Sequence, residues 1–259
     1  MAEASPVALR SGWRHGFFHA AFQRRARAGL RAIRLAQWGR PQVPAGPLVV
    51  FANHPSWWDG IAFVVLAQAL FPGRQIYAPM AAEALARYRF MRRIGMFGVE
   101  AGTPRGAAAF LRAAEAVLAA PGAMLWVNAP GRFMDPRARP VPVVPGLTRL
   151  AEMAPGASFL PLALDYPFWG EARPEMLCGF GPPIAAATLL AEPRAGRAAL
   201  LGSALEATMN RLAADAISRD PARFATLLQG REGMGGVYQL WRRLGAVLRG
   251  QPFDPRHEA

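Results

Sequence analysis

The sequence predicts an α/β protein in which helices flank a single mixed, largely parallel sheet, with a basic amphipathic helix at each end of the chain. Short apolar runs typical of strands alternate with helical patterns between residues 48 and 217, as expected for a largely parallel sheet. With 259 residues, 53% of them hydrophobic, the chain is long enough to bury one large core. It has no run of about 18 uncharged apolar residues, the usual minimum for a membrane-spanning helix. We expect one α/β domain with terminal additions.

The N-terminal region combines apolar and arginine side chains without a proline from residue 13 to residue 38. The apolar members are Trp13, Phe17, Phe18, Phe22, Leu30, Ile33 and Leu35, and the basic members are Arg24, Arg25, Arg27, Arg31 and Arg34. This pattern predicts a helix with an apolar side and a basic side, which either packs on its own domain or lies on a membrane surface. Three prolines in GRPQVPAGP then break the helix. Residues 1–44 are therefore predicted to form an N-terminal helix and a linker.

The next segments, in residues 45–230, are predicted to form the α/β domain. Apolar runs of four to nine residues indicate strands, and longer stretches with helical periodicity indicate helices. The expected strands are 48–53, 75–80, 96–100, 123–128, 158–166 and 175–180, with a further extended segment at 141–144. The expected helices are 60–70, 81–92, 103–119, 146–153 and 198–217.

The C-terminal segment, residues 231–259, contains VYQLWRRLGAVLRG, which again mixes apolar residues with arginines. We expect a second basic amphipathic helix there. Two such ends on an α/β core favour a membrane surface over a DNA groove. No helix-turn-helix, zinc or RNP pattern is present, so we expect no nucleic-acid partner.

The charge balance also indicates an anionic partner. The net charge of +13 comes from 30 basic and 17 acidic residues, and every basic one is arginine. Such an excess favours an anionic membrane surface or phosphorylated substrates. The single cysteine, Cys178, excludes an intrachain disulfide and suggests a reducing compartment. The first ten residues show no secretory signal pattern.

The stretch VVFANHPSWWDGIAF contains the one histidine that lies away from the chain ends, His54, and Asp59 follows five residues later. His54 falls at the predicted carboxyl end of a strand, where sites gather in α/β sheets. Asp59 could simply cap the next helix, and His54 could be an ordinary loop histidine. The functional interpretation makes His54 a general base, with Asp59 holding the second ring nitrogen to fix the tautomer.

NHPSWWDG resembles the His-x-x-x-x-Asp signature of the glycerol-phosphate and lysophospholipid acyltransferases, including the 1-acylglycerol-3-phosphate acyltransferases. In that family an asparagine usually precedes the histidine, as Asn53 does here. The resemblance implies a glycerol-3-phosphate acyltransferase-like α/β fold and an O-acyltransferase of bacterial phospholipid biosynthesis. It implies that His54, oriented by Asp59, deprotonates a hydroxyl of a lysophospholipid-like acceptor. That hydroxyl attacks the thioester of acyl-CoA or acyl carrier protein, with no metal and no other cofactor.

The later blocks of the family are only partly present, over residues 45–185. In GMFGVEAGTPRG the arginine that usually follows the acidic residue is replaced by Ala101, and Arg105 is a candidate substitute. In LWVNAPGRF, which stands where the family has Pro-Glu-Gly-Thr-Arg, Gly131 keeps its place and Arg132 comes one position early. The glutamate is missing unless Asp135 replaces it. The resemblance thus implies substrate contacts at Asn53, Arg105, Asn128, Gly131 and Arg132.

Two other functions fit parts of the pattern. A hydrolase could use Ser56 with His54, although no Gly-x-Ser-x-Gly elbow is present. A non-catalytic lipid- or membrane-surface-binding protein could use the same scaffold, because the second and third blocks are altered. As a separate prediction, the two basic amphipathic ends indicate a peripheral protein on the cytoplasmic face of the inner membrane.

Overall fold

The computed structural model describes residues 5–231, 244 and 248–249. Within these residues the fold is α/β with one mixed, mostly parallel sheet flanked by helices, which confirms the predicted fold class. No helix in the described part of the chain is long and apolar enough to cross a membrane. The C-terminal helix predicted in residues 231–259 lies outside the described residues, apart from 231, 244, 248 and 249.

The sheet has nine strands in the described region, in the order β4-β3-β5-β2-β6-β7-β1-β9, with β8 paired to β6. The strands are β1 (Ala32–Ala36), β2 (Leu48–Ala52), β3 (Gln75–Ala81), β4 (Met96–Val99), β5 (Ala123–Asn128), β6 (Ser158–Asp165), β7 (Glu175–Phe180), β8 (Ile184–Ala185) and β9 (Phe224–Gln229). From β4 to β6 all neighbours are parallel, so these five carboxyl ends meet at one edge. Antiparallel pairs join β6 to β7 and to β8, and β1 to β9.

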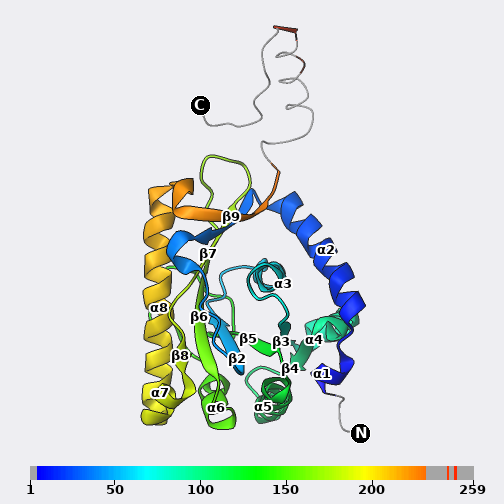
Figure 1. Cartoon of the computed structure of the whole chain (residues 1–259), viewed down its shortest axis with the longest axis vertical. Coiled ribbons are helices and arrows are strands. Elements are labelled where there is room, and N and C mark those ends of the chain that lie inside the picture. The colour runs from blue at the N-terminus through cyan, green and yellow to red at the C-terminus, as the bar shows by residue number, and fades with distance from the viewer. Residues whose placement is uncertain (1–4, 232–243, 245–247, 250–259) are drawn as a thin grey trace.

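Helices cover both faces of the sheet. They are α1 (Pro6–Leu9), α2 (Gly12–Gly29), α3 (Asp59–Leu70), α4 (Ala82–Arg87), α5 (Pro104–Ala119), α6 (Pro145–Met153), α7 (Ala186–Ala191) and α8 (Arg194–Ser218), with 3-10 turns at Gln37–Gly39, Arg89–Ile94 and Pro221–Arg223. Residues of α5, α6, α7 and α8 form the core on one face, and residues of α2 and α3 form the core on the other. In Figure 1, α8 and α2 lie on opposite sides of the molecule, with the sheet and α3 between them.

The central strand β2 shows why the fold class could be predicted from the sequence. Val49 and Phe51 of β2 enter the core under α5 and α6, whereas Leu48 and Val50 enter the core under α3. Side chains of a strand alternate between its two faces, so both faces of β2 are apolar and all five of its residues are buried. Parallel strands covered by helices on both sides require this continuous apolar run.

The predicted N-terminal helix is too long. α2 ends at Gly29, and β1 lies between β7 and β9 in the sheet, so the helix prediction is wrong from residue 30 onward. Ile33 and Leu35 belong to a strand whose five residues are all buried. Arg34, assigned to the basic side of a helix, is also buried, where its Nε donates to Glu175 Oε2 at 2.9 Å. Pairing on both strand edges outweighs the weak helical pattern. β1 also precedes the predicted boundary at residue 44. The sheet therefore contains strands from both residues 1–44 and residues 45–230.

Several smaller differences concern short elements. The helix predicted at 81–92 is instead α4 followed by a 3-10 turn at Arg89–Ile94, and the segment 141–144, expected to be extended, does not join the sheet as a strand. The elements α1, β8, α7 and β9 were not predicted. Each is short or gains its pairing partner only from the tertiary fold, as β9 does beside β1. The other predicted strands and helices lie within a few residues of the observed ones.

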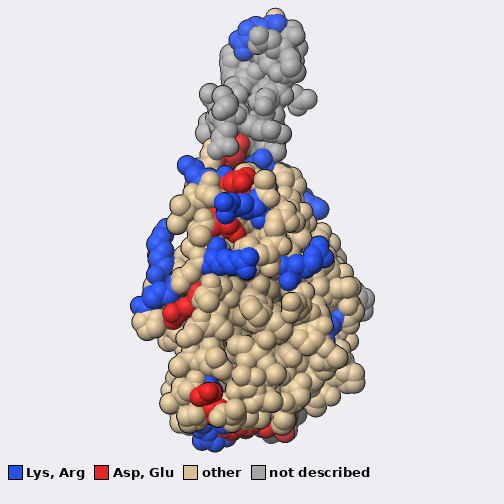
Figure 2. Space-filling model, turned by 60° about the vertical axis from the view of Figure 1, so that its left-hand side comes forward, with Lys and Arg blue, Asp and Glu red and all other residues tan. Residues whose placement is uncertain are grey.

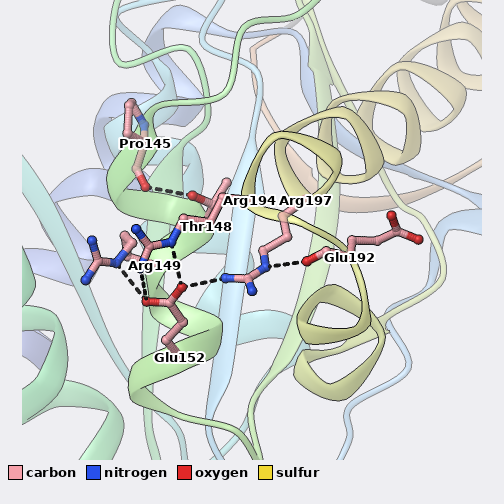
Figure 3. A network of polar contacts seen from close by, with 7 residues as sticks. All are labelled: Pro145, Thr148, Arg149, Glu152, Glu192, Arg194 and Arg197. Atoms are coloured by element: carbon pink, nitrogen blue, oxygen red, sulfur yellow. Dashed lines mark hydrogen bonds and ion pairs between the residues drawn. The ribbon is translucent and has the colours of Figure 1, made fainter.

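Charge is unevenly distributed over the surface. On the face drawn in Figure 2, basic side chains gather in the upper half, and a broad area with few charges lies below them. At the amino edge of the sheet, one carboxylate joins two helices (Figure 3): Glu152 of α6 accepts from Arg149 of the same helix and from Arg194 and Arg197 of α8. The hydrogen bonds from Arg197 and Arg194 lower the pKa of Glu152 below its usual value. Because Arg197 also donates to the carbonyl of Glu192, next to α7, the cluster fixes the helices at the edge opposite His54.

Candidate active site

The turn between β2 and α3 brings His54 and Asp59 together. β2 ends at Ala52, and Pro55 keeps His54 out of the helical region before α3 begins at Asp59. The Nδ1 atom of His54 lies 2.6 Å from Oδ2 of Asp59. An ionised carboxylate only accepts, so the contact suits the tautomer that carries the hydrogen on Nδ1. The turn therefore brings the two predicted side chains into hydrogen-bonding contact.

Asp59 uses its carboxylate for the site rather than for capping its own helix. It is 1% exposed, and Oδ2 also accepts from the backbone N–H of Ser56 at 3.2 Å. Oδ1 accepts from the hydroxyl of Tyr166 at 2.7 Å. None of these donors is a backbone N–H of α3, so the capping interpretation does not describe the contacts. Its position in the first turn still places the negative charge favourably in the helix dipole.

Tyr166 is a site residue that sequence reasoning missed. It follows β6, the parallel neighbour of β2, so the two strands deliver Tyr166 and His54 to the same edge. Burial raises the pKa of Tyr166 well above its usual value, and the charge of Asp59 and the hydrogen bond to it add to the rise. The phenol therefore remains a donor at neutral pH. The only sequence signal was its place at the end of a predicted strand, and that signal does not say which strands are neighbours.

Replacing Tyr166 by phenylalanine is expected to lower kcat for the proposed reaction about tenfold, because a hydrogen bond to a charged group contributes about 1.5–3 kcal/mol and only part of it is transmitted to His54. KM for the acyl donor should stay unchanged, because the lost hydroxyl donates to the buried Asp59. Steady-state kinetics measures both, with Tyr88→Phe, an exposed tyrosine, as the matched control. An equal fall in the two variants, or a change in KM alone, would contradict the positioning role.

The remaining edge of the His54 ring is available to a ligand. Nε2 has no hydrogen-bond partner in the described part of the chain and is not fully buried. The side chain is 20% exposed. The ring of Phe133 stacks on the imidazole with centroids 4.1 Å apart, and the N–H of Met134 donates to the carbonyl of His54 at 2.9 Å. The loop after β5 thus covers one face of the ring and leaves the Nε2 edge free.

Asn53 braces the sheet below the site. Its Nδ2 donates to the carbonyl of Leu164 and its Oδ1 accepts from the N–H of Leu164, each at 2.8 Å. The residue is buried. Both polar ends of the amide are therefore occupied by the backbone of β6. The structure gives Asn53 a role in holding β2 beside β6, whereas the resemblance implied a substrate contact.

The third block forms the turn beside His54. β5 ends at Asn128, which pairs with Ala52 in the parallel register. The N–H of Gly131 donates to the carbonyl of Asn128 at 3.0 Å, and Gly131 has φ +66°, a conformation that favours glycine. A Cβ at Gly131 would also lie 2.7 Å from the side chain of Val144. Oδ1 of Asn128 is buried and has no hydrogen-bond partner among the described residues, and Arg132 is exposed. The turn brings Asn128, Gly131 and Arg132 to the edge that carries His54.

Arg105 lies farther away. It is exposed in the first turn of α5, after β4, and β4 is three strands from β2 in the sheet. With strands about 4.8 Å apart, this is a separation of roughly 14 Å, so Arg105 and His54 are at the same edge but not in contact. Asp135, the possible replacement for the family glutamate, accepts from the backbone and from Nη1 of Arg137.

The hydrolase alternative requires a serine beside His54. Oγ of Ser56 accepts from the backbone N–H of Trp58 at 3.2 Å, and none of the hydrogen bonds of the described residues joins it to His54. The expected nucleophile–base contact is therefore not formed by this serine. Among the described residues, no group of three or more His, Cys, Asp or Glu side chains is arranged to hold a metal ion.

Comparison with known proteins finds no family model and no curated protein that matches the chain. The fold and the site alone thus define the class: an α/β protein with a histidine–aspartate pair at the carboxyl edge of a parallel sheet.

Proposed function

We propose that this protein is an O-acyltransferase that moves a fatty acyl group from acyl-CoA or acyl carrier protein to a hydroxyl of a lysophospholipid-like acceptor. The observation that carries the proposal is the 2.6 Å contact between Nδ1 of His54 and the buried Asp59, which leaves Nε2 for a substrate. Imidazole is suited to take and return a proton near neutral pH. The resemblance of NHPSWWDG to the acyltransferase signature supports the same reaction.

In this mechanism His54 acts first as a base and then as an acid. Nε2 takes the proton of the acceptor hydroxyl while the oxygen of that hydroxyl attacks the thioester carbonyl. The tetrahedral intermediate then expels the thiolate, which takes the proton from Nε2 and leaves as a thiol. Asp59 keeps the hydrogen on Nδ1 and stabilises the imidazolium between the two steps. An ester forms, a thioester breaks, and the histidine is restored.

The substrate groups are assigned to the residues around the turn after β5. Arg132 is exposed beside Phe133, and its guanidinium suits the phosphate of an acceptor head group or of the acyl donor. Arg105 would meet only a distant part of a long substrate, given the roughly 14 Å between the strands that precede Arg105 and His54. Backbone N–H groups or a nearby arginine would stabilise the oxyanion.

A non-catalytic lipid-binding protein on the same scaffold is the second candidate. It is favoured by the ring of Phe133, which stacks over the His54 imidazole and leaves a substrate less room to reach the imidazole. Ala101, which stands where the family has an arginine, also favours the non-catalytic candidate.

The experiment is a substrate panel. Purified protein is incubated with radiolabelled acyl-CoA or acyl carrier protein and a series of lysolipids, and the products are separated by chromatography. We expect labelled diacyl lipid. Free fatty acid as the sole product would indicate a hydrolase, and lipid binding without product for any donor would favour the second candidate.

A further inference from the structure

Three large aromatic side chains form an exposed rim around the candidate site. Trp57 is 65% exposed, Phe133 61% and Phe168 65%. They follow β2, β5 and β6, respectively, and these strands are parallel neighbours in the order β5-β2-β6. The loops that carry the three side chains therefore leave the same edge of the sheet. Phe133 also contacts His54 directly.

The end of α2 adds positive charge beside this rim. Trp57 packs edge-to-face on Trp58, with ring centroids 5.6 Å apart, and the guanidinium of Arg25 lies 5.4 Å from the ring of Trp58. Gly29 is so close to Trp58 that a Cβ there would meet the indole at 2.3 Å. The last two turns of α2 are thus held against the tryptophan pair that follows His54.

An open cavity of about 440 Å³ lies on the adjoining face of α2. It is lined by Arg24, Arg27, Ala28, Gln229, Gly230 and Arg231. Three of these six are arginines, and no carboxylate is among them. Arg132, next to Phe133, supplies a further exposed guanidinium at the rim. Aromatic and cationic side chains therefore occur together along one side of the molecule.

We propose that this rim docks on an anionic bilayer, with Trp57, Phe133 and Phe168 in the interfacial layer and the arginines at the level of the lipid phosphates. Indole and phenyl rings have a large apolar area, and three of them exposed around one site are typical of an interaction surface. Each arginine near an anionic surface adds to the electrostatic attraction. Charge complementarity thus selects an anionic bilayer over a neutral one.

This inference extends the proposed function but does not depend on it. It differs from attachment by the chain ends alone, because α2 packs on α3 and the docking residues surround His54. A lysolipid leaving the bilayer would meet the His54 edge directly, while a polar acyl donor arrives from water.

The test is flotation of the full-length chain with vesicles of phosphatidylcholine alone or of phosphatidylcholine with phosphatidylglycerol. We expect flotation with the anionic vesicles, and at least about a tenfold lower partition coefficient for Trp57→Ser/Phe133→Ser/Phe168→Ser, because three apolar rings are no longer transferred from water to the interface. Ile217→Ser is the matched control, because Ile217 is 81% exposed on α8. Arg24→Gln/Arg27→Gln should weaken anionic-vesicle binding and its salt dependence. Thermal unfolding by circular dichroism checks that each variant is folded.

A second readout locates the contact. Lipids brominated near the head group should quench the fluorescence of the wild-type protein more than that of Trp57→Phe. Equal quenching, equal flotation of the triple variant and wild type, or a triple variant no weaker than Ile217→Ser would overturn the proposal. Failure of the wild-type chain to float with anionic vesicles would also overturn it. Dimerisation of the wild-type chain through the rim, without vesicle binding, would count as the same outcome. Flotation of the wild-type protein without any acyl transfer would contradict the proposed function and leave the proposed membrane surface standing.

Discussion

Replacing Asp59 by asparagine is expected to lower kcat by about 10⁴-fold, the loss caused by the same change in histidine–aspartate pairs of triads. The amide no longer stabilises an imidazolium, and it offers an N–H where His54, Ser56 and Tyr166 all donate. Either the imidazole takes the tautomer with the hydrogen on Nε2, or a donor stays unpaired. In the first case no lone pair remains on Nε2 to accept the proton of the acceptor. Single-turnover acyl transfer measures the loss.

The control for Asp59→Asn is Glu115→Gln, which makes the same chemical change at an exposed position of α5. This variant should retain wild-type turnover. Because Asp59 is buried, Asp59→Asn should also be less stable by about 1–3 kcal/mol, the cost of leaving buried donors unpaired. Turnover within tenfold of wild type in Asp59→Asn would show that the carboxylate does not orient His54.

Replacing Trp126 by alanine is expected to reduce the free energy of unfolding by about 3–5 kcal/mol, the range for removing a buried large aromatic side chain. The indole is fully buried in β5 beneath α3. Its ring lies 4.8 Å from that of Phe63, 5.9 Å from that of Phe71 and 6.3 Å from that of Phe180, centroid to centroid. Alanine would leave a cavity that this close-packed set cannot fill without moving α3. Urea denaturation followed by circular dichroism measures the loss.

Two further variants separate volume from chemistry in the Trp126 experiment. Trp57→Ala removes the same side chain from an exposed position and should cost no more than about 0.5 kcal/mol. Trp126→Phe should cost clearly less than Trp126→Ala, because the ring remains and the Nε1 hydrogen, which has no partner in the described structure, is removed. Similar losses for Trp126→Ala and Trp57→Ala would contradict the packing of α3 on β5.

The elements that the sequence predicted well are those whose pattern is local. Residues 48–52 are apolar throughout because both faces of β2 are covered, and Pro55 and Asp59 mark the turn and the helix start. The pairing of His54 with Asp59 followed from the same short stretch. The strand end, the turn and the helix start depend on residues that are close in sequence, so this part of the site could be predicted from the sequence.

The features that escaped prediction depend on neighbours that are distant in sequence. Residues 32–36 are a strand because β7 and β9 pair with them, and the buried guanidinium of Arg34 is paired with the carboxylate of Glu175, which lies beside Ala32 in the register. Tyr166 and Phe133 reach the His54–Asp59 pair from β6 and β5, whose order beside β2 no local pattern encodes. For the same reason the hydrogen bonds of Asn53 to the backbone of Leu164 could not be predicted from the sequence around Asn53.

The most direct test of the central claim is the ratio of acyl-transfer rates of wild type and His54→Ala on one preparation of donor and lysolipid. General base catalysis contributes about 10²–10⁴-fold, so the variant should be slower by that factor. His54 is partly exposed, and Asp59 keeps its bonds from Ser56 and Tyr166, so the fold should persist. His19→Ala, on α2, should transfer at the wild-type rate. Labelled diacyl lipid formed by a folded His54→Ala protein at the wild-type rate would contradict the claim.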